Sequence, residues 1–121
     1  MTAIAAQRVV AGFLLEAMSN LRPNTTGVQG AVIWISAGEF AGTSLQHGPR
    51  VKVVLGDKIT TEGLADAVSV RISKPPKVLG TLPGRVRAQV IRFVTKNHDV
   101  LLKHWNGDLD AKETLDQLQS I

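Results

Sequence analysis

Residues 81–107 read TLPGRVRAQVIRFVTKNHDVLLKHWNG, a long stretch with the period of an amphipathic helix. Thr81 is the expected N-cap, Pro83 fits the first turn, and Asn106-Gly107 is the expected C-cap. Apolar residues recur at steps of three, four and seven, interrupted by Asn97, and cations recur at steps of seven, four and seven. The apolar face comprises Val86, Val90, Phe93, Val94, Leu101 and Trp105; the cationic face comprises Arg85, Arg92, Lys96 and Lys103.

The composition is that of a globular protein with one domain. The chain has 121 residues, of which 44% are hydrophobic and 20% charged, so residues 1–121 are expected to share one core. No apolar stretch approaches the roughly 18 residues of a membrane span, and no secretory signal is recognisable. The absence of cysteine excludes disulfides and thiolate metal sites and favours a reducing compartment. We therefore expect a cytoplasmic protein with no membrane association.

The first 80 residues predict one helix followed by three strands. Apolar residues at helical spacing predict a helix over Thr2–Leu21, which Pro23 should end. The run Ala31–Ser36 is apolar throughout, as expected of a central strand that is buried on both faces. Residues 50–55, which alternate between polar and apolar side chains over their first four positions, and residues 68–73, which alternate throughout, are the other two strands, and Pro75-Pro76 should close the sheet.

The remaining residues complete an α+β architecture. Asp110 and Glu113 have the spacing of a capping box, which predicts a last helix. Strands that are grouped together, and do not alternate with helices, favour the α+β class. The expected fold is an N-terminal helix, a small, mostly antiparallel three-stranded sheet, and two C-terminal helices packed on one face.

Positive charge is concentrated in the middle of the chain. Residues 50–103 contain eleven Lys or Arg and four Asp or Glu, whereas residues 104–121 contain one Lys and four acids. This asymmetry favours an acidic protein or a nucleic acid as partner, although a solvated surface has the same pattern. With few aromatic residues for stacking, a duplex fits better than a single strand. The candidate binding residues are Arg50, Lys52, Arg71, Arg85, Arg92, Lys96 and Lys103, which form one surface if the sheet and the long helix adjoin.

Signals for catalysis are weaker. His98 and His104 are six residues apart and do not share a helical face, so neither a metal site nor a cofactor is expected. Glu39 and His47 lie in one glycine-rich segment and could act as general base and acid. The alternative function is therefore a small metal-independent ribonuclease. A further alternative is a structural subunit that self-associates through Thr2–Leu21.

Two segments that begin with glutamine resemble the short peptides that dock on bacterial replication clamps. They are residues 89–93, QVIRF, and residues 117–121, QLQSI. In such peptides a glutamine precedes apolar anchors, and the alternative for both segments is ordinary helical packing. The resemblance implies an action on DNA replication.

The C-terminal part also resembles a family of small bacterial proteins of unknown function. The similarity covers about residues 45–121 and is most specific at Leu101-Leu102-x-x-Trp105-Asn106-Gly107. Related proteins have a histidine- and proline-rich start to a strand, to which only His47 and Pro49 correspond here. The family is associated with toxin–antitoxin and mobile-element systems and supplies no active site. The resemblance implies a non-enzymatic toxin–antitoxin-type component, a growth inhibitor or its partner.

Overall fold

The structure is a computed structural model that describes residues 18–36, 48–56, 63 and 65–121. It belongs to the α+β class, as expected. Along the chain the elements are β1 (Met18–Leu21), α2 (Pro23–Thr26), β2 (Ala31–Ser36), β3 (Arg50–Leu55), β4 (Val68–Arg71), β5 (Lys77–Leu79), α4 (Gly84–Lys96), α5 (His98–Trp105) and α6 (Ala111–Gln117). Within the described ranges, no helix is long and apolar enough to cross a lipid bilayer.

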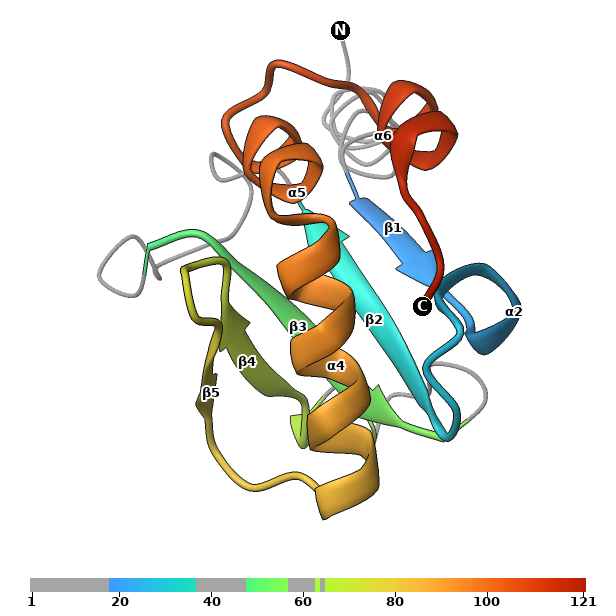
Figure 1. The fold of residues 1–121 in the computed structure, drawn as a ribbon, viewed down its shortest axis with the longest axis vertical. Helices are drawn as coiled ribbons and strands as arrows, with labels where there is room; N and C mark the ends of the chain where they lie inside the picture. Colours follow the sequence, from blue (N-terminus) through green and yellow to red (C-terminus); the bar gives the residue numbers. More distant parts are fainter. Residues whose placement is uncertain (1–17, 37–47, 57–62, 64) are drawn as a thin grey trace, which may run out of the picture.

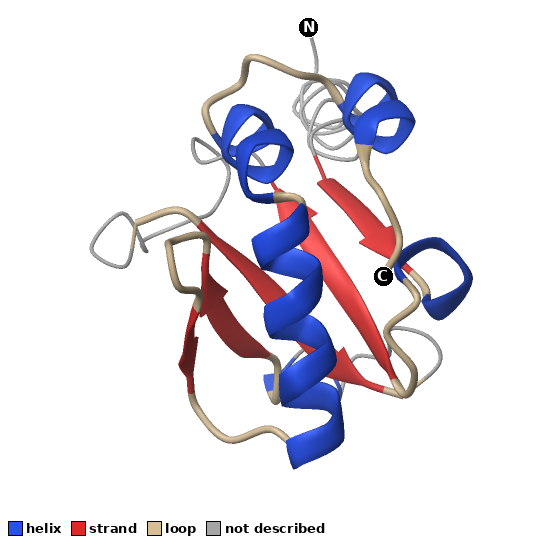
Figure 2. Ribbon diagram, in the orientation of Figure 1, coloured by secondary structure: helices blue, strands red, loops and turns tan. Residues whose placement is uncertain are grey.

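The sheet has five strands, so the predicted three-stranded sheet was wrong. The strands lie side by side in chain order, β1 to β5, and all neighbours are antiparallel (Figure 2). The prolines at 75 and 76 do not end the sheet. They lie in a turn after which Lys77–Leu79 return beside β4 as the edge strand β5. Proline is compatible with such a turn because it lies outside the hydrogen-bonded ladder.

The N-terminal helix predicted over Thr2–Leu21 was wrong at its end. Residues Met18–Leu21 form β1 and pair with β2, from Met18 opposite Ser36 to Leu21 opposite Ile33. Apolar residues three apart fit a helix locally, but the exposed edge of β2 offers this segment a full set of interstrand hydrogen bonds. Residues 2–17 of the predicted helix lie outside the described residues.

Strand β2 is buried on both faces, as predicted. Its neighbouring residues Val32 and Ile33 are both 0% exposed, although they point to opposite sides of the sheet. Helix α4 lies across one of these sides (Figure 1). The core there joins three fully buried residues of α4, Val90, Phe93 and Val94, to residues of the sheet. Full burial of such side chains contributes roughly 1.5–3 kcal/mol each, so this contact accounts for much of the stability.

The single helix predicted over residues 81–107 is two helices. Helix α4 begins at Gly84, after Pro83, and ends at Asn97, where α5 takes over. The Nδ2 of Asn97 donates to the Phe93 carbonyl at 3.0 Å, and the Asn97 side chain also contacts Gln119. An asparagine side chain that bonds to nearby main chain competes with helical hydrogen bonds, which explains the break at this residue.

The two C-terminal helix boundaries near residues 107 and 110 follow the sequence signals. Gly107 has φ +81°, and the amides of Gly107 and Asp108 donate to the carbonyls of His104 and Lys103, as in a Schellman cap. Asp110 accepts from the Glu113 amide at 2.7 Å and donates its own amide to the Glu113 carboxylate at 3.2 Å. The predicted capping box is therefore confirmed.

The core position of Phe93 gives a test of the packing. Phe93→Ala should lower the free energy of unfolding by about 3–5 kcal/mol, because a fully buried ring is lost from a packed interior. Arg92→Ala, an exposed position on the same helix, should change it by less than about 0.5 kcal/mol. Urea unfolding followed by circular dichroism measures both. Similar losses for the two variants would contradict this core.

Candidate functional site

Helix α4 has an unusual charge balance. Its sequence, GRVRAQVIRFVTK, contains Arg85, Arg87, Arg92 and Lys96 and no acidic residue. All four cations are exposed. Arg85, Arg92 and Lys96, spaced by seven and four residues, share the side of α4 that lies away from its buried valines. We call these three residues the cationic surface.

The ion pairs among the described residues do not involve the arginines of this helix. In the part of the chain that the structure describes, none of Arg85, Arg87 and Arg92 forms an ion pair; the pair present there joins His98 and Asp99 at 2.9 Å. Arg85 and Arg87 also lie in the first turn of α4, where the helix dipole disfavours positive charge. Helix stability therefore does not explain these arginines.

Lys96 is exposed to solvent and also contacts the C-terminal segment. Its Nζ donates to the Ser120 carbonyl at 2.8 Å. An ammonium group has three donors, so two remain for a partner. Lys96 also lies between two open grooves. One is lined by Ile91, Arg92, Thr95, Lys96 and Ile121, and the other by Lys74, Thr95, Lys96, Asn97, His98, Asp99 and Val100.

The second groove is electrostatically mixed. The His98 Nδ1 lies 2.9 Å from the Asp99 carboxylate. This hydrogen bond, and then the positive charge of Lys74, hold the pKa of Asp99 below its usual range. The carboxylate therefore stays ionised beside Lys74 and weakens the attraction of this groove for an anion. The groove beside Arg92 is lined by two cations, Arg92 and Lys96, and by no Asp or Glu.

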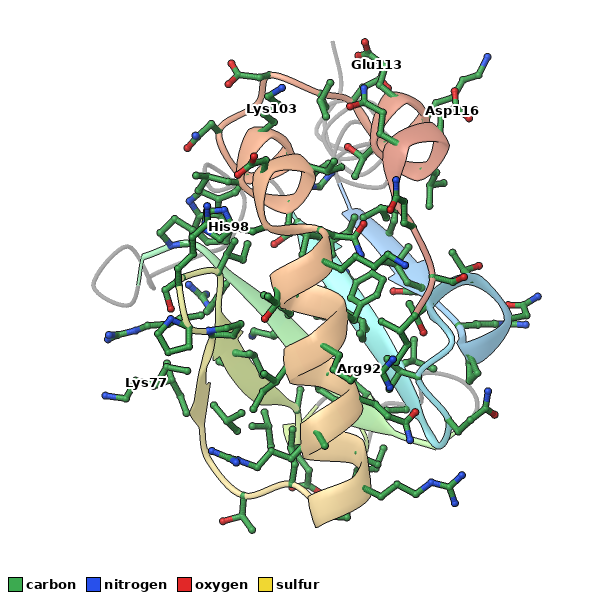
Figure 3. All side chains as sticks on the ribbon, viewed as in Figure 1. Lys77, Arg92, His98, Lys103, Glu113 and Asp116 are labelled. Atoms are coloured by element: carbon green, nitrogen blue, oxygen red, sulfur yellow. The ribbon has the colours of Figure 1, made fainter. Side chains whose placement is uncertain are left out.

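Lys103 does not continue the cationic surface. It is exposed on α5, beyond the break at Asn97, so helical spacing no longer relates it to Lys96. Figure 3 shows Arg92 on the middle of α4 and Lys103 on the separate helix α5.

The sheet cations lie on the opposite side of the sheet from α4. Strands β3 and β4 pair antiparallel as expected, with Arg50 opposite Arg71. These residues alternate with Val51 and Val70, which belong to the core under α4. Lys52 alternates in the same way and shares their face. The predicted continuous basic surface is therefore not formed, because the sheet separates its two halves.

Arg50 is buried, although its place in an alternating strand predicts exposure to solvent. It is only 4% exposed, and its guanidinium carbon lies 5.5 Å from the centre of the Trp105 ring. Burial lowers the pKa of Arg50. Lys52 and Arg71 are half-buried, and the Lys52 Nζ lies 5.8 Å from the centre of the Trp34 ring. Both aromatic contacts are cation–π pairs, which the sequence could not show: one depends on the packing of α5 and the other on the register of β2 and β3.

Both glutamine-led segments are engaged within the fold. In residues 89–93, Val90 and Phe93 are fully buried, and the Gln89 side chain accepts from the Gln29 amide at 2.7 Å. In residues 117–121, Gln119 is bonded to Asn97. Neither segment is presented as a free peptide in this structure.

The proposed catalytic residues Glu39 and His47 lie outside the described residues. Among those described, no group of three or more His, Cys, Asp or Glu is arranged to hold a metal ion. His104 is buried, and its Nε2 has no hydrogen-bond partner. A role for His104 in stability is therefore clearer than a role in chemistry.

Comparisons with protein-family models, curated proteins and solved structures gave no significant match. The geometry of the chain itself is therefore the basis for assigning the site.

His104 should make the fold sensitive to acid. Burial lowers its pKa, and the negative charge of Asp110 opposes this effect only in part. The unfolded chain then takes up a proton at about pH 6.5, before the folded chain does, so stability should fall as the pH drops below that value. The slope is at most about 1.4 kcal/mol per pH unit for one proton.

Urea unfolding between pH 7.5 and 5.5 measures this slope. His104→Leu should reduce it, because the titrating group is removed. His98→Gln is the control and should leave the slope in place, since His104 is unchanged in this variant. Equal slopes for wild type and His104→Leu would exclude His104 as the origin.

Proposed function

We propose that this protein acts by binding an acidic macromolecule through the cationic surface of α4, and that it is not an enzyme. The observation that supports the proposal is the charge of α4, which combines four exposed cations with no acid. Unpaired arginines keep their donors available for phosphate or carboxylate groups. Exposed cations at helical spacing also match the even distribution of charge along a nucleic-acid backbone or an acidic helix.

The first turn of α4 adds to this proposal. Two arginines at the positive end of the helix dipole raise the local potential, as do the unpaired amides that begin every helix. An anionic group of the partner near this turn would be attracted by Arg85, by Arg87 and by the unpaired amides. The sheet cations Arg50, Lys52 and Arg71 are left out of this contact, because they lie behind the sheet.

The biological setting is a separate proposal. The likeness of residues 45–121 to toxin–antitoxin-associated proteins supports a growth inhibitor or its partner, acting in the cytoplasm. The proposal leaves out docking on a replication clamp, since both glutamine-led segments are engaged in the fold. The ribonuclease and the self-associating subunit have no described residue in their favour.

Charge reversal tests the cationic surface. Arg85→Glu/Arg92→Glu should weaken binding to a duplex DNA or RNA by about tenfold or more at low salt, because two phosphate contacts are lost. The salt dependence should fall by about one counterion per arginine. Fluorescence anisotropy with a labelled duplex, repeated over a range of salt concentrations, measures both.

Lys77→Glu/Lys112→Glu is the matched control. It changes the net charge by the same amount, at exposed lysines outside α4, and Figure 3 shows Lys77 pointing away from that helix. Equal losses in the two double variants would mean that only net charge matters. If wild type binds no duplex, the same pair of variants should be compared for retention of acidic host proteins. Equal retention there would exclude the surface altogether.

A further inference from the structure

Residues Leu118–Ile121 follow α6 and run beside α4 to α2 without forming a helix or a strand (Figure 1). We call this segment the strap. It is held to the body of the protein by hydrogen bonds to its main chain at three consecutive residues, Gln119, Ser120 and Ile121. The surface that contacts it is formed by residues far away in the sequence, on α2 and at the junction of α4 and α5.

Asn97 holds the middle of the strap. Its Nδ2 donates to the Gln119 carbonyl at 2.8 Å, and the Gln119 amide donates to its Oδ1, also at 2.8 Å. The side-chain amide thus pairs with a peptide group in both directions, as a neighbouring strand would. Asn97 is only 2% exposed, so this pairing is protected from water. Because it uses main-chain atoms, it does not require a glutamine in the strap.

Helix α2 holds the last residue of the strap. The Ile121 amide donates to the Thr26 carbonyl at 2.9 Å. Gly27 lies against the same residue: a Cβ atom at position 27 would be 2.7 Å from the Ile121 carbonyl oxygen. The absence of a side chain at Gly27 therefore allows the close approach of a peptide main chain.

The strap has two side chains that face the core and two that face solvent. Leu118 and Ile121 pack against the core, whereas Gln119 and Ser120 are exposed. The contacting surface thus packs against two aliphatic side chains three residues apart and bonds to the main chain between them. These are the properties of a site for an extended peptide, in which main-chain hydrogen bonds give affinity and pockets give specificity.

We propose that the surface that contacts the strap, formed by Thr26, Gly27, Lys96 and Asn97 and called the groove from here on, is a peptide-binding site that the strap occupies in cis. Its ligand in trans is an extended segment of a partner protein with aliphatic residues at positions i and i+3. Such a segment can make every contact of the strap, because the groove reads main chain and two aliphatic side chains. The site goes beyond the cationic surface, since it recognises an uncharged segment.

The groove also shares one residue with the cationic surface. Lys96 donates to the Ser120 carbonyl and is exposed beside Arg92. A peptide that replaced the strap would therefore take over a contact of Lys96. Occupancy of the groove and binding of an acidic partner are coupled through this ammonium group.

A peptide of residues 116–121, DQLQSI, labelled with a fluorophore, tests the groove. In the full chain, Leu118→Ser/Ile121→Ser weakens the strap and leaves the groove intact. The labelled peptide should bind this variant about tenfold or more tightly than wild type, because the intramolecular competitor is weakened. A peptide with both aliphatic residues replaced by serine should not compete. Equal binding to the two proteins, or equal competition by the serine peptide, would overturn the proposal.

Two glycine substitutions locate the bound peptide. Gly27 and Gly30 have φ of +80° and +81°, so an alanine strains the backbone similarly at either position. The added Cβ meets the Ile121 main chain at 2.7 Å in Gly27→Ala, but its nearest neighbour in Gly30→Ala is 3.9 Å away. In the weakened-strap protein, Gly27→Ala should reduce peptide affinity and Gly30→Ala should not. Equal effects would place the peptide elsewhere.

Wild-type protein provides a test that does not depend on the folding of the strap variant. With excess unlabelled peptide, the side-chain amide signals of Asn97 and the main-chain amide signal of Gln119 should shift together in an NMR titration. This test on wild-type protein applies even if the weakened-strap variant is unfolded. Signals that stay unchanged at both residues would also overturn the proposal. Duplex binding by Arg85→Glu/Arg92→Glu is measured independently, so failure of one proposal is distinguishable from failure of the other.

Discussion

The buried amide of Asn97 is the interaction on which the C-terminal half of the structure depends. Its two polar atoms bond to the Phe93 carbonyl and to both polar groups of Gln119. Leaving such groups buried without partners costs about 1–3 kcal/mol each, so the residue requires the strap or another main chain in its place. The same side chain bonds to the last turn of α4 and fixes residues 118–121 against the body. A helix boundary and a contact between distant segments thus have one physical cause.

The sheet imposes the second constraint. Side chains that alternate along a strand must point to opposite faces, and α4 covers only one of them. Val51 and Val53 of β3 and Val70 of β4 belong to that face, so the cations that alternate with them are turned to the other. Arg50 and Arg71 become direct neighbours there, an unfavourable pairing of like charges that Trp105 partly offsets through its contact with Arg50. The cations of the sheet and those of α4, which were expected to form one surface, are therefore separated by the thickness of the sheet.

The two candidate sites differ in how far they could be predicted from the sequence. The cationic face of α4 follows from helical spacing alone, because Arg85, Arg92 and Lys96 lie within one uninterrupted helix. Lys103 was grouped with them only because the break at Asn97 was not foreseen. The groove around the strap has no sequence pattern, since its residues come from positions 26, 27, 96 and 97. The one available signal was a polar asparagine within an otherwise apolar stripe.

The sequence by itself determined the features that depend on neighbours along the chain. The capping box of Asp110 and Glu113 and the Gly107 cap result from contacts within a few residues, and the burial of β2 and of one face of α4 is visible in the local pattern of apolar residues. Only the tertiary structure decided that Met18–Leu21 is a strand, that Lys77–Leu79 return as a fifth strand, and that the long helix divides. The two strands depend on hydrogen bonds to a distant partner, β2 and β4 respectively, and the break at Asn97 combines a local bond to Phe93 with bonds of the same side chain to the strap. Local periodicity cannot anticipate such a partner, because it is brought near only by folding.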